Sequence, residues 1–458
     1  MTSDQKEFDA IVVGTGPGGA TVARELSLKG KKVLILEWGD YAPAKGSFFQ
    51  YASGAFIPGK SLLITPDFLS TVRGITTGGS SYFYCATAYN PPVDMLNSHG
   101  VQISDEIEEL KNEIPIDPLS DELFGPGPKK VMESAQELGY DWDKLNKFIY
   151  QDKCLPKCQL CMYGCPHGAK WNGRHFVDEA LEKGAQIINK AKVEKVIIEN
   201  NAAVGVEYKQ RRKRKSACAP LIILAAGGIG SPIILRQTGI SNAGYDFFFD
   251  PLIVAWGKIK GINEGKAIPM SAGMHLKDDG IMMTDIPMGY LQKLIFDAGV
   301  FKIKQMFSYS NFVPIMIKVR DELGGHLTDK GGVRKKLAEN DKQKLMKGYE
   351  IAKEIFNNAG ASEIYKTWYI AAHPGGTVKI GELVDNNLKT EFDNLYVCDC
   401  SVIPEKFGLP PTFTLAALGK RLVKHLLSEQ TILDDKPIET KVKTPVGEDL
   451  TTEKEKAA

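Results

Sequence analysis

The sequence has no long apolar run and almost no excess of charge of either sign. Its hydrophobic stretches stay well short of the roughly 20 residues that a membrane-spanning helix needs. Its 57 Lys and Arg against 56 Asp and Glu leave a formal net charge of +1, so nothing points to a nucleic-acid or polyanion partner. Residues 1–7 lack the basic and then apolar pattern of a signal peptide. We therefore expect a cytoplasmic protein without membrane association.

Cysteine is sparse except in one short stretch. Of the eight cysteines, four fall in a single loop: Cys154, Cys158, Cys161 and Cys165. Thiols this dense indicate a reducing compartment and a metal site rather than a disulfide framework. The spacing is C-x3-C-x2-C-x3-C-P, and its last three cysteines and the proline match ferredoxin loops. We expect a [4Fe–4S] cluster, with zinc less favoured because zinc knuckles are usually two distant C-x-x-C pairs. The other four are expected to be small buried residues: Cys85, Cys218, Cys398 and Cys400.

A strand, a glycine-rich turn, a helix and a second strand follow one another over residues 8–37. Gly14, Gly16 and Gly19 have G-x-G-x-x-G spacing, which lets a pyrophosphate approach the backbone at a helix N-terminus. Glu37 ends the second strand, where a carboxylate accepts hydrogen bonds from ribose hydroxyls. The unit predicts a Rossmann-type domain for NAD or FAD, and a glycine turn without a ligand is the alternative.

Patterns farther along predict additional elements. Residues 60–100 are rich in glycine, serine and proline and are typical of loop, whereas residues 103–148 look mostly helical. Asn200-Asn201 marks a hairpin turn, and β-like runs over residues 245–320 favour an antiparallel sheet. The basic run at residues 211–215 is typical of a solvated turn, with a docking patch for an acidic carrier as the alternative.

Three further segments decide for FAD. They are RGITTGGSS at 73–81, a strand and glycine turn before a helix at 221–240, and HPGGT at 373–377 followed by NLYVCDCSVIP at 394–404. Ser231 and Pro232 are expected to start the helix of the second segment. Together with the first turn, these segments resemble the glucose–methanol–choline (GMC) oxidoreductase family from residue 8 to about residue 425.

The resemblance implies an α/β fold, with a discontinuous Rossmann-type FAD-binding domain and a smaller antiparallel-sheet substrate domain. It implies that Gly78, Gly79 and Ser80 lie against the flavin and pyrophosphate, Val193 at the adenine end and Asp399 beside the ribityl chain. An acid that merely closes a loop is the alternative for Asp399. The residues expected at the cofactor are Gly14, Gly16, Gly19, Glu37, Arg73, Gly78, Gly79, Ser80, Val193, Ala226, Gly227, Asp399, Pro411 and Thr412. The final helix would point its N-terminus at the flavin, where its dipole favours the charge of the reduced form.

The catalytic residue implied by the resemblance is His373. Alcohol oxidation needs a base for the hydroxyl proton, and an imidazole titrates in the right range. The family usually places an Asn where this chain has Pro410, and another where it has Tyr84. Because proline has no side-chain donor, His373 is expected to act alone or with Tyr84, or the substrate is not a simple alcohol. A packed aromatic is the alternative for Tyr84.

These patterns divide the chain into seven expected segments. The FAD-binding domain takes residues 1–100, 176–244 and 366–428, interrupted by a helical insertion (101–150), the cluster loop (151–175) and the substrate domain (245–365), and a disordered tail follows (429–458).

The combination predicts a dehydrogenase that oxidises a hydroxyl-bearing small molecule with FAD. Electrons would leave singly through the cluster to a protein carrier such as a ferredoxin. Three alternatives remain: a ferredoxin-fed reductase of a C=C or carbonyl group, a non-catalytic electron-transfer subunit, and a zinc-bearing oxidase. A cluster with a purely structural role is the further alternative for the cysteine loop.

Overall fold

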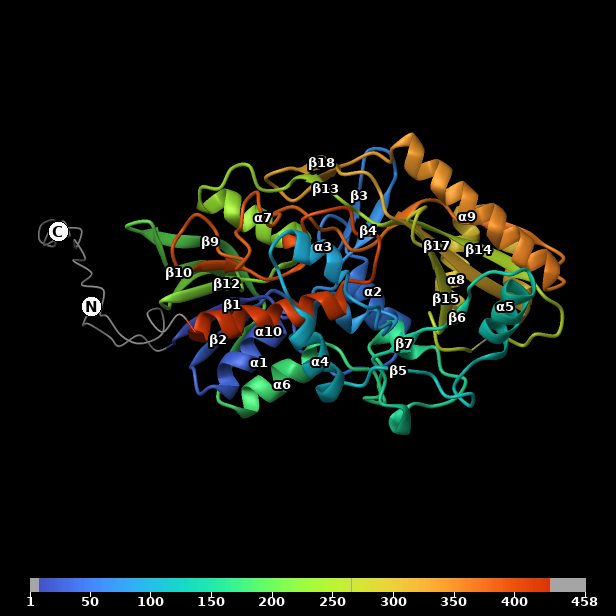
Figure 1. Ribbon diagram of the computed structural model, residues 1–458, viewed down its shortest axis with the longest axis horizontal. Coiled ribbons are helices and arrows are strands. Elements are labelled where there is room, and N and C mark those ends of the chain that lie inside the picture. Colours follow the sequence, from blue (N-terminus) through green and yellow to red (C-terminus); the bar gives the residue numbers. More distant parts are fainter. Residues whose placement is uncertain (1–7, 265, 429–458) are drawn as a thin grey trace, which may run out of the picture.

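A computed structural model describes residues 8–264 and 266–428, and its first part is a five-stranded parallel sheet (Figure 1). The strand order is β22-β12-β1-β2-β8. Their bounds are β1 (Ala10–Val13), β2 (Val33–Glu37), β8 (Gln186–Asn189), β12 (Leu221–Leu224) and β22 (Leu395–Val397). Strands covered on both faces are continuous apolar runs, as in β1 and β2, which are buried throughout. The Rossmann-type domain is confirmed.

Helices cover one face of this sheet. There, α1 packs against α6 and α10, and α4 packs on α10, whereas α7 lies on the other side and packs on β9 (Ala191–Glu199) (Figure 1). Their bounds are α1 (Pro17–Leu28), α4 (Ser104–Glu113), α6 (Gly173–Glu182), α7 (Gly227–Thr238) and α10 (Thr412–Ser428). Since α7 begins at Gly227, the expectation that Ser231 starts this helix is wrong. The Ser231 hydroxyl instead reaches back and accepts from the backbone N–H of Ala226 at 3.0 Å.

The second part is a larger, mostly antiparallel sheet of order β3-β4-β21-β14-β17-β16-β15-β6, with β20 on β14. The bounds are β3 (Leu62–Ile64), β4 (Ser70–Val72), β6 (Asp143–Lys144), β14 (Pro251–Lys258), β15 (Ala272–Leu276), β16 (Ile281–Asp285), β17 (Phe312–Val319), β20 (Ile364–Lys366) and β21 (Ile370–Ala371). Alternate residues of β14 point to opposite faces. Ile253 and Ala255 join the core beneath α9 (Glu339–Asn358), whereas Leu252 and Val254 belong to a cluster on the other face. The predicted antiparallel sheet is therefore present.

A three-stranded antiparallel sheet lies beside the first part, with β9 (Ala191–Glu199), β10 (Ala202–Gln210) and β11 (Lys213–Cys218). The predicted hairpin turn is confirmed, because Asn200 and Asn201 have φ of +48° and +65°, as a two-residue turn between twisted strands requires. The basic run is exposed, partly in the next turn and partly on β11.

The sheets draw on segments that the sequence patterns placed elsewhere. The expected helical insertion is divided, because α4 joins the first core while α5 (Pro126–Glu137) packs on α9. The expected loop at 60–100 contains β3, β4 and α3 (Val93–Ser98). The remaining elements are α2 (Phe48–Ala55), α8 (Tyr290–Gly299), β5 (Asp117–Pro118), β7 (Asn146–Lys147), β13 (Tyr245–Phe247), β18 (Gly324–Leu327) and β19 (Val333–Arg334). The expected disordered tail at 429–458 lies outside the described residues. Of the described helices, none has the length and apolarity to cross a bilayer.

The core beneath α9 offers a stability test. Leu345 is fully buried there, so Leu345→Ala should lower the free energy of unfolding by about 2–5 kcal/mol, through lost transfer energy and a residual cavity. Gln343→Ala, at an exposed position of the same helix, should change it by less than about 0.5 kcal/mol. Urea titration followed by circular dichroism measures both, and equal effects would contradict this account of the core.

Candidate active site

The glycine-rich turn between β1 and α1 keeps the backbone free of side chains. Gly14 has a φ of +99°, and a Cβ there would lie 2.3 Å from the carbonyl oxygen of Ala225. A Cβ on Gly19 would lie 2.4 Å from the Gly14 oxygen, whereas Gly16 faces open space and begins α1 without a side-chain cap. The first N–H groups of α1 are therefore available to a phosphate.

The second glycine loop lies directly against this turn. Gly78 has a φ of +92°, and its N–H donates to the hydroxyl of Thr15 at 3.0 Å. Gly79 has a φ of +56°, and a Cβ there would lie 2.9 Å from the Gly16 Cα. The close approach of the two backbones needs glycine at position 79, whereas the positive φ favours glycine at position 78.

Glu37 is buried at the end of β2. Its carboxylate accepts from the N–H and hydroxyl of Thr15 and from the N–H of Gly39. Burial raises the pKa of this carboxyl, and the hydrogen bonds from Thr15 and Gly39 oppose the rise. The Glu37 carboxylate thus stabilises the glycine turn through these hydrogen bonds. Its predicted contact with a ribose stays a prediction.

Asp399 follows β22 and is also buried. Its carboxylate accepts from the N–H of Gly227 at 2.8 Å, the N–H of Ser401 at 2.8 Å and the hydroxyl of Ser231. Burial raises the pKa of Asp399. The side chain therefore orders the start of α7 while also lining the cavity described next.

A cavity of about 710 Å³ lies between the two parts of the fold. The structure brings most of the predicted cofactor residues to it, although Gly19 and Gly78 are not among its lining residues. Those that line it are Gly14, Gly16, Glu37, Arg73, Gly79, Ser80, Val193, Ala226, Gly227, Asp399, Pro411 and Thr412. Thr412 is the first residue of α10, so this helix presents its N-terminal end to the cavity. An uncapped helix start beside two glycine loops fits a dinucleotide such as FAD.

His373 lines the same cavity and has a partner that the sequence motifs did not reveal. Its Nδ1 lies 3.1 Å from Asp250 Oδ2 and 3.5 Å from Lys318 Nζ. The second carboxylate oxygen of Asp250 accepts from the N–H of Gly408 at 2.8 Å. Burial lowers the pKa of His373, the charge of Lys318 lowers it further, and Asp250 opposes both.

The register of the large sheet assembles this group. Lys318 on β17 is opposite Leu252 on β14, and Pro251 is opposite Ala371, so Asp250 and His373 both leave the sheet at the same edge. Asp250 and His373 have φ of +49° and +46°, a conformation that costs about 1–3 kcal/mol for a residue other than glycine and is concentrated at functional sites. The sequence feature that could have identified Asp250 is its position directly before the buried run that forms β14.

Tyr84 lines the cavity but is not the partner of His373. Its hydroxyl donates to the carbonyl of Trp171 at 2.8 Å, and its ring stacks on Phe148. Burial raises the pKa of this hydroxyl well above its usual range. Asp250, rather than Tyr84, is the polar side chain hydrogen-bonded to His373.

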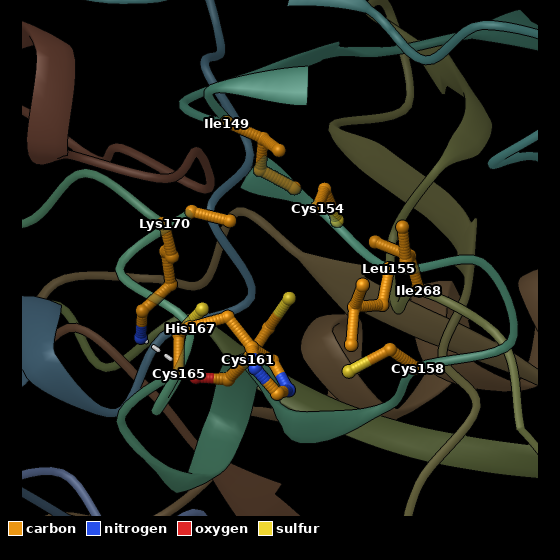
Figure 2. A pocket seen from close by; sticks show the side chains of 10 residues that line it. Ile149, Cys154, Leu155, Cys158, Cys161, Cys165, His167, Lys170 and Ile268 are labelled. Carbon is orange, nitrogen blue, oxygen red and sulfur yellow. Dashed lines mark hydrogen bonds between the residues drawn. The ribbon is translucent and has the colours of Figure 1, made fainter. Parts of the chain in front are cut away.

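The four clustered cysteines line one small cavity together with apolar side chains and with His167 (Figure 2). All four thiols are free; Cys161 and Cys165 are buried, and Cys154 and Cys158 are half-buried. Lys170 also lines this cavity, and its Nζ donates to the carbonyl of Cys161 at 2.7 Å. The volume is about 10 Å³, so a four-iron cluster fits the donor set only if the loop opens around it.

A single metal ion does not fit this arrangement as it stands either. Four thiolates on one zinc stand roughly 3.8 Å apart, given zinc–sulfur bonds of about 2.3 Å. Within residues 8–264 and 266–428, no group of three or more His, Cys, Asp or Glu side chains is placed to hold one metal ion. Of the remaining cysteines, Cys398 and Cys400 are buried as expected and Cys85 is partly so, but Cys218 is exposed. The expectation for Cys218 is wrong because it ends β11, an edge strand.

Known proteins match almost the whole chain. A family model described as GMC oxidoreductase matches residues 9–253, and a second one with the same description matches residues 333–419. An uncharacterized protein of Methanocaldococcus jannaschii is 28% identical, over 92% of this chain and 100% of its own. A long-chain-alcohol oxidase of Arabidopsis thaliana is 23% identical, over 91% of this chain and 68% of its own.

Two solved structures share the fold. Pyridoxine 4-oxidase from Mesorbium loti has a TM-score of 0.72 over 92% of this chain and 99% of its own. Formate oxidase has a TM-score of 0.73 over 94% of this chain and 100% of its own. Both are 15% identical to this chain, so the likeness is one of fold.

Gly14→Ala tests the cofactor cradle. The added Cβ would meet the Ala225 oxygen at 2.3 Å, so we expect the flavin content of the purified protein to fall at least about tenfold. The matched control is Gly30→Ala, also at positive φ (+77°) but with no atom near its Cβ, which should keep its flavin. The measurement is flavin absorbance per chain, and normal flavin in Gly14→Ala would contradict the assignment.

Proposed function

This chain belongs to the GMC oxidoreductase family, and we propose that it is an FAD-dependent dehydrogenase of a hydroxyl-bearing substrate. The observation that supports this most is the pairing of His373 with Asp250 at the wall of the cavity shared by the glycine turn and the start of α10. FAD, when bound there, accepts the hydride that leaves the substrate carbon. The protein's own residues must bind the substrate and remove its hydroxyl proton.

His373 is suited to take that proton. A carboxylate beside Nδ1 favours the tautomer in which Nδ1 is protonated and donates to Asp250, which leaves Nε2 as the acceptor. The C–H bond breaks as hydride, the O–H proton passes to Nε2, and the carbon–oxygen bond becomes a carbonyl. Burial and the nearby Lys318 lower the pKa of His373, which keeps the imidazole neutral and ready to accept at neutral pH.

The other walls of the cavity favour an apolar substrate. Leu252 and Met316 reach it from β14 and β17, and Met270 and Ile286 complete this side. Apolar walls beside the polar pair of His373 and Lys318 would orient a molecule that has one hydroxyl on a hydrocarbon body. The name of the Arabidopsis relative, a long-chain-alcohol oxidase, agrees with this class.

We further propose that electrons leave through a [4Fe–4S] cluster held by Cys154, Cys158, Cys161 and Cys165. One layer of side chains divides the two cavities. Tyr84 lines the large one, its ring centroid is 5.0 Å from Lys170 Nζ, and Lys170 lines the cysteine cavity. A cluster, when bound, carries one electron at a time, which suits a ferredoxin-like carrier as partner.

The base role of His373 predicts a pH profile. Activity needs the neutral imidazole, so it should fall as the pH drops through the His373 pKa, which lies below the ordinary 6.5. In Lys318→Met the charge that lowers this pKa is lost, so the acidic limb should move to higher pH. His373→Gln should lose at least about 100-fold in turnover while keeping FAD. The measurement is kcat against pH, and an unmoved limb in Lys318→Met would refute the assignment of the limb to His373.

The cluster predicts a composition and a preferred acceptor. Protein purified without oxygen should contain about four irons and four sulfides per FAD, and it should reduce a ferredoxin faster than oxygen. Cys161→Ser should lose iron and ferredoxin reduction but keep FAD and dye-linked oxidation of substrate. Cys218→Ser, an exposed cysteine outside the loop, is the control. Zinc without sulfide, or peroxide as the main product, would overturn the electron path and favour an oxidase.

A further inference from the structure

Two of the buried lysines differ from the rest in what balances their charge. Five buried lysines form ion pairs with carboxylates, among them Lys293 with Asp297 at 2.5 Å and Lys335 with Asp321 at 3.0 Å. Lys147 and Lys170 are 0% and 1% exposed. Within the described chain, neither has a carboxylate oxygen inside the 4.0 Å of an ion pair.

Carbonyl groups satisfy the hydrogen bonds of Lys147. Its Nζ donates to Cys85, Pro269 and Met270 at 2.7, 2.8 and 3.0 Å, and to the Thr87 hydroxyl at 3.2 Å. Carbonyl dipoles complete its three donor positions but supply no full negative charge. Burying an ammonium group has a large desolvation cost, and neutral carbonyl groups offset only part of it because they bring no counter-charge.

Lys170 is held in the same manner. Its Nζ donates to the carbonyls of Tyr82 and Cys161, both at 2.7 Å, and to those of Tyr84 and Ser81 at 3.3 and 3.4 Å. Ser81 and Tyr84 line the large cavity, and Cys161 lines the cysteine cavity. The ammonium group of Lys170 therefore lies between the two cavities.

Lys170 lines the cysteine cavity, and Lys147 lies close enough to the loop to act on it electrostatically. Each interacts electrostatically with the Cys161 sulfur, and Lys170 also with Cys165; Figure 2 shows Lys170 beside these two cysteines. Cys85 also acts on both lysines, and the Asp285 carboxylate acts on Lys147 from beyond ion-pair distance. Four thiolates on a cluster in this loop would add negative charge near both ammonium groups.

We propose that Lys147 and Lys170 are the counter-charges of an anionic [4Fe–4S] cluster in the Cys154–Cys165 loop and that they raise its reduction potential. The inference rests on the proposed function. Four thiolates give the cluster a net negative charge, which grows on reduction, and a nearby buried cation stabilises the reduced form more. The two lysines thereby favour electron transfer from reduced FAD to the cluster.

The test is a redox titration of the cluster followed by electron paramagnetic resonance, on the whole anaerobic protein. Lys170→Met and Lys147→Met should each lower the equilibrium constant for one-electron reduction at least about tenfold, which is about 59 mV. Lys170→Arg keeps the charge and should restore most of the potential. Lys153→Met removes a charge from the same loop at an exposed position, where solvent screens it, and should leave the potential within a few-fold of wild type.

The outcomes separate the two proposals. Wild-type protein without iron and sulfide would overturn the cluster and, with it, this inference. A wild-type cluster whose potential is unchanged in both methionine variants would overturn the role of the lysines alone. If a methionine variant loses its fold, judged by FAD content, the comparison of Lys170→Arg and Lys147→Gln with wild type decides instead, because only the second removes charge.

Discussion

The buried carboxylate of Asp250 is the interaction on which the arrangement of this site depends. One oxygen accepts from the N–H of Gly408, and the other faces His373 and Lys318. It thereby joins the edge of the large sheet to the loop before α10, which belongs to the dinucleotide domain. If one member of such a buried group lost its charge, the charges of the other members would be left without a partner. Orientation of the proposed base and alignment of the two parts are therefore maintained by the same side chain.

The two proposed cofactors are linked through a single wall. Residues 81–87 line or back the large cavity, and their carbonyls hold the ammonium groups of Lys147 and Lys170 beside the cysteines. A hydride acceptor on one side and a one-electron carrier on the other need this closeness. The same wall also contains the two positive charges that an anionic cluster would need nearby.

Local features could be predicted from the sequence. The turn at Gly14 lies between a strand and a helix only a few residues away, and the hairpin at Asn200-Asn201 is formed by adjoining strands, so neighbouring residues determine both. The partner of His373 could not be found in this way. Asp250 is 123 residues from His373 and 68 from Lys318, and only the antiparallel register of β14 with β17 and β21 brings the three together. Tyr84, which the motif suggested as a partner of His373, instead donates its hydroxyl to the carbonyl of Trp171.

The sequence by itself determined the glycine turns, the positions of the strands and helices that frame them, and the four-thiol loop, because each depends on spacing within a short segment. The tertiary structure decided which polar groups meet. It placed Asp250 beside His373 and hydrogen-bonded Tyr84 to Trp171. It also buried Lys147 and Lys170 near the cysteines with no carboxylate within ion-pair distance in the described chain. These pairings depend on which distant strands and loops become neighbours, and the cost of burying a charge then selects among the partners that packing makes available.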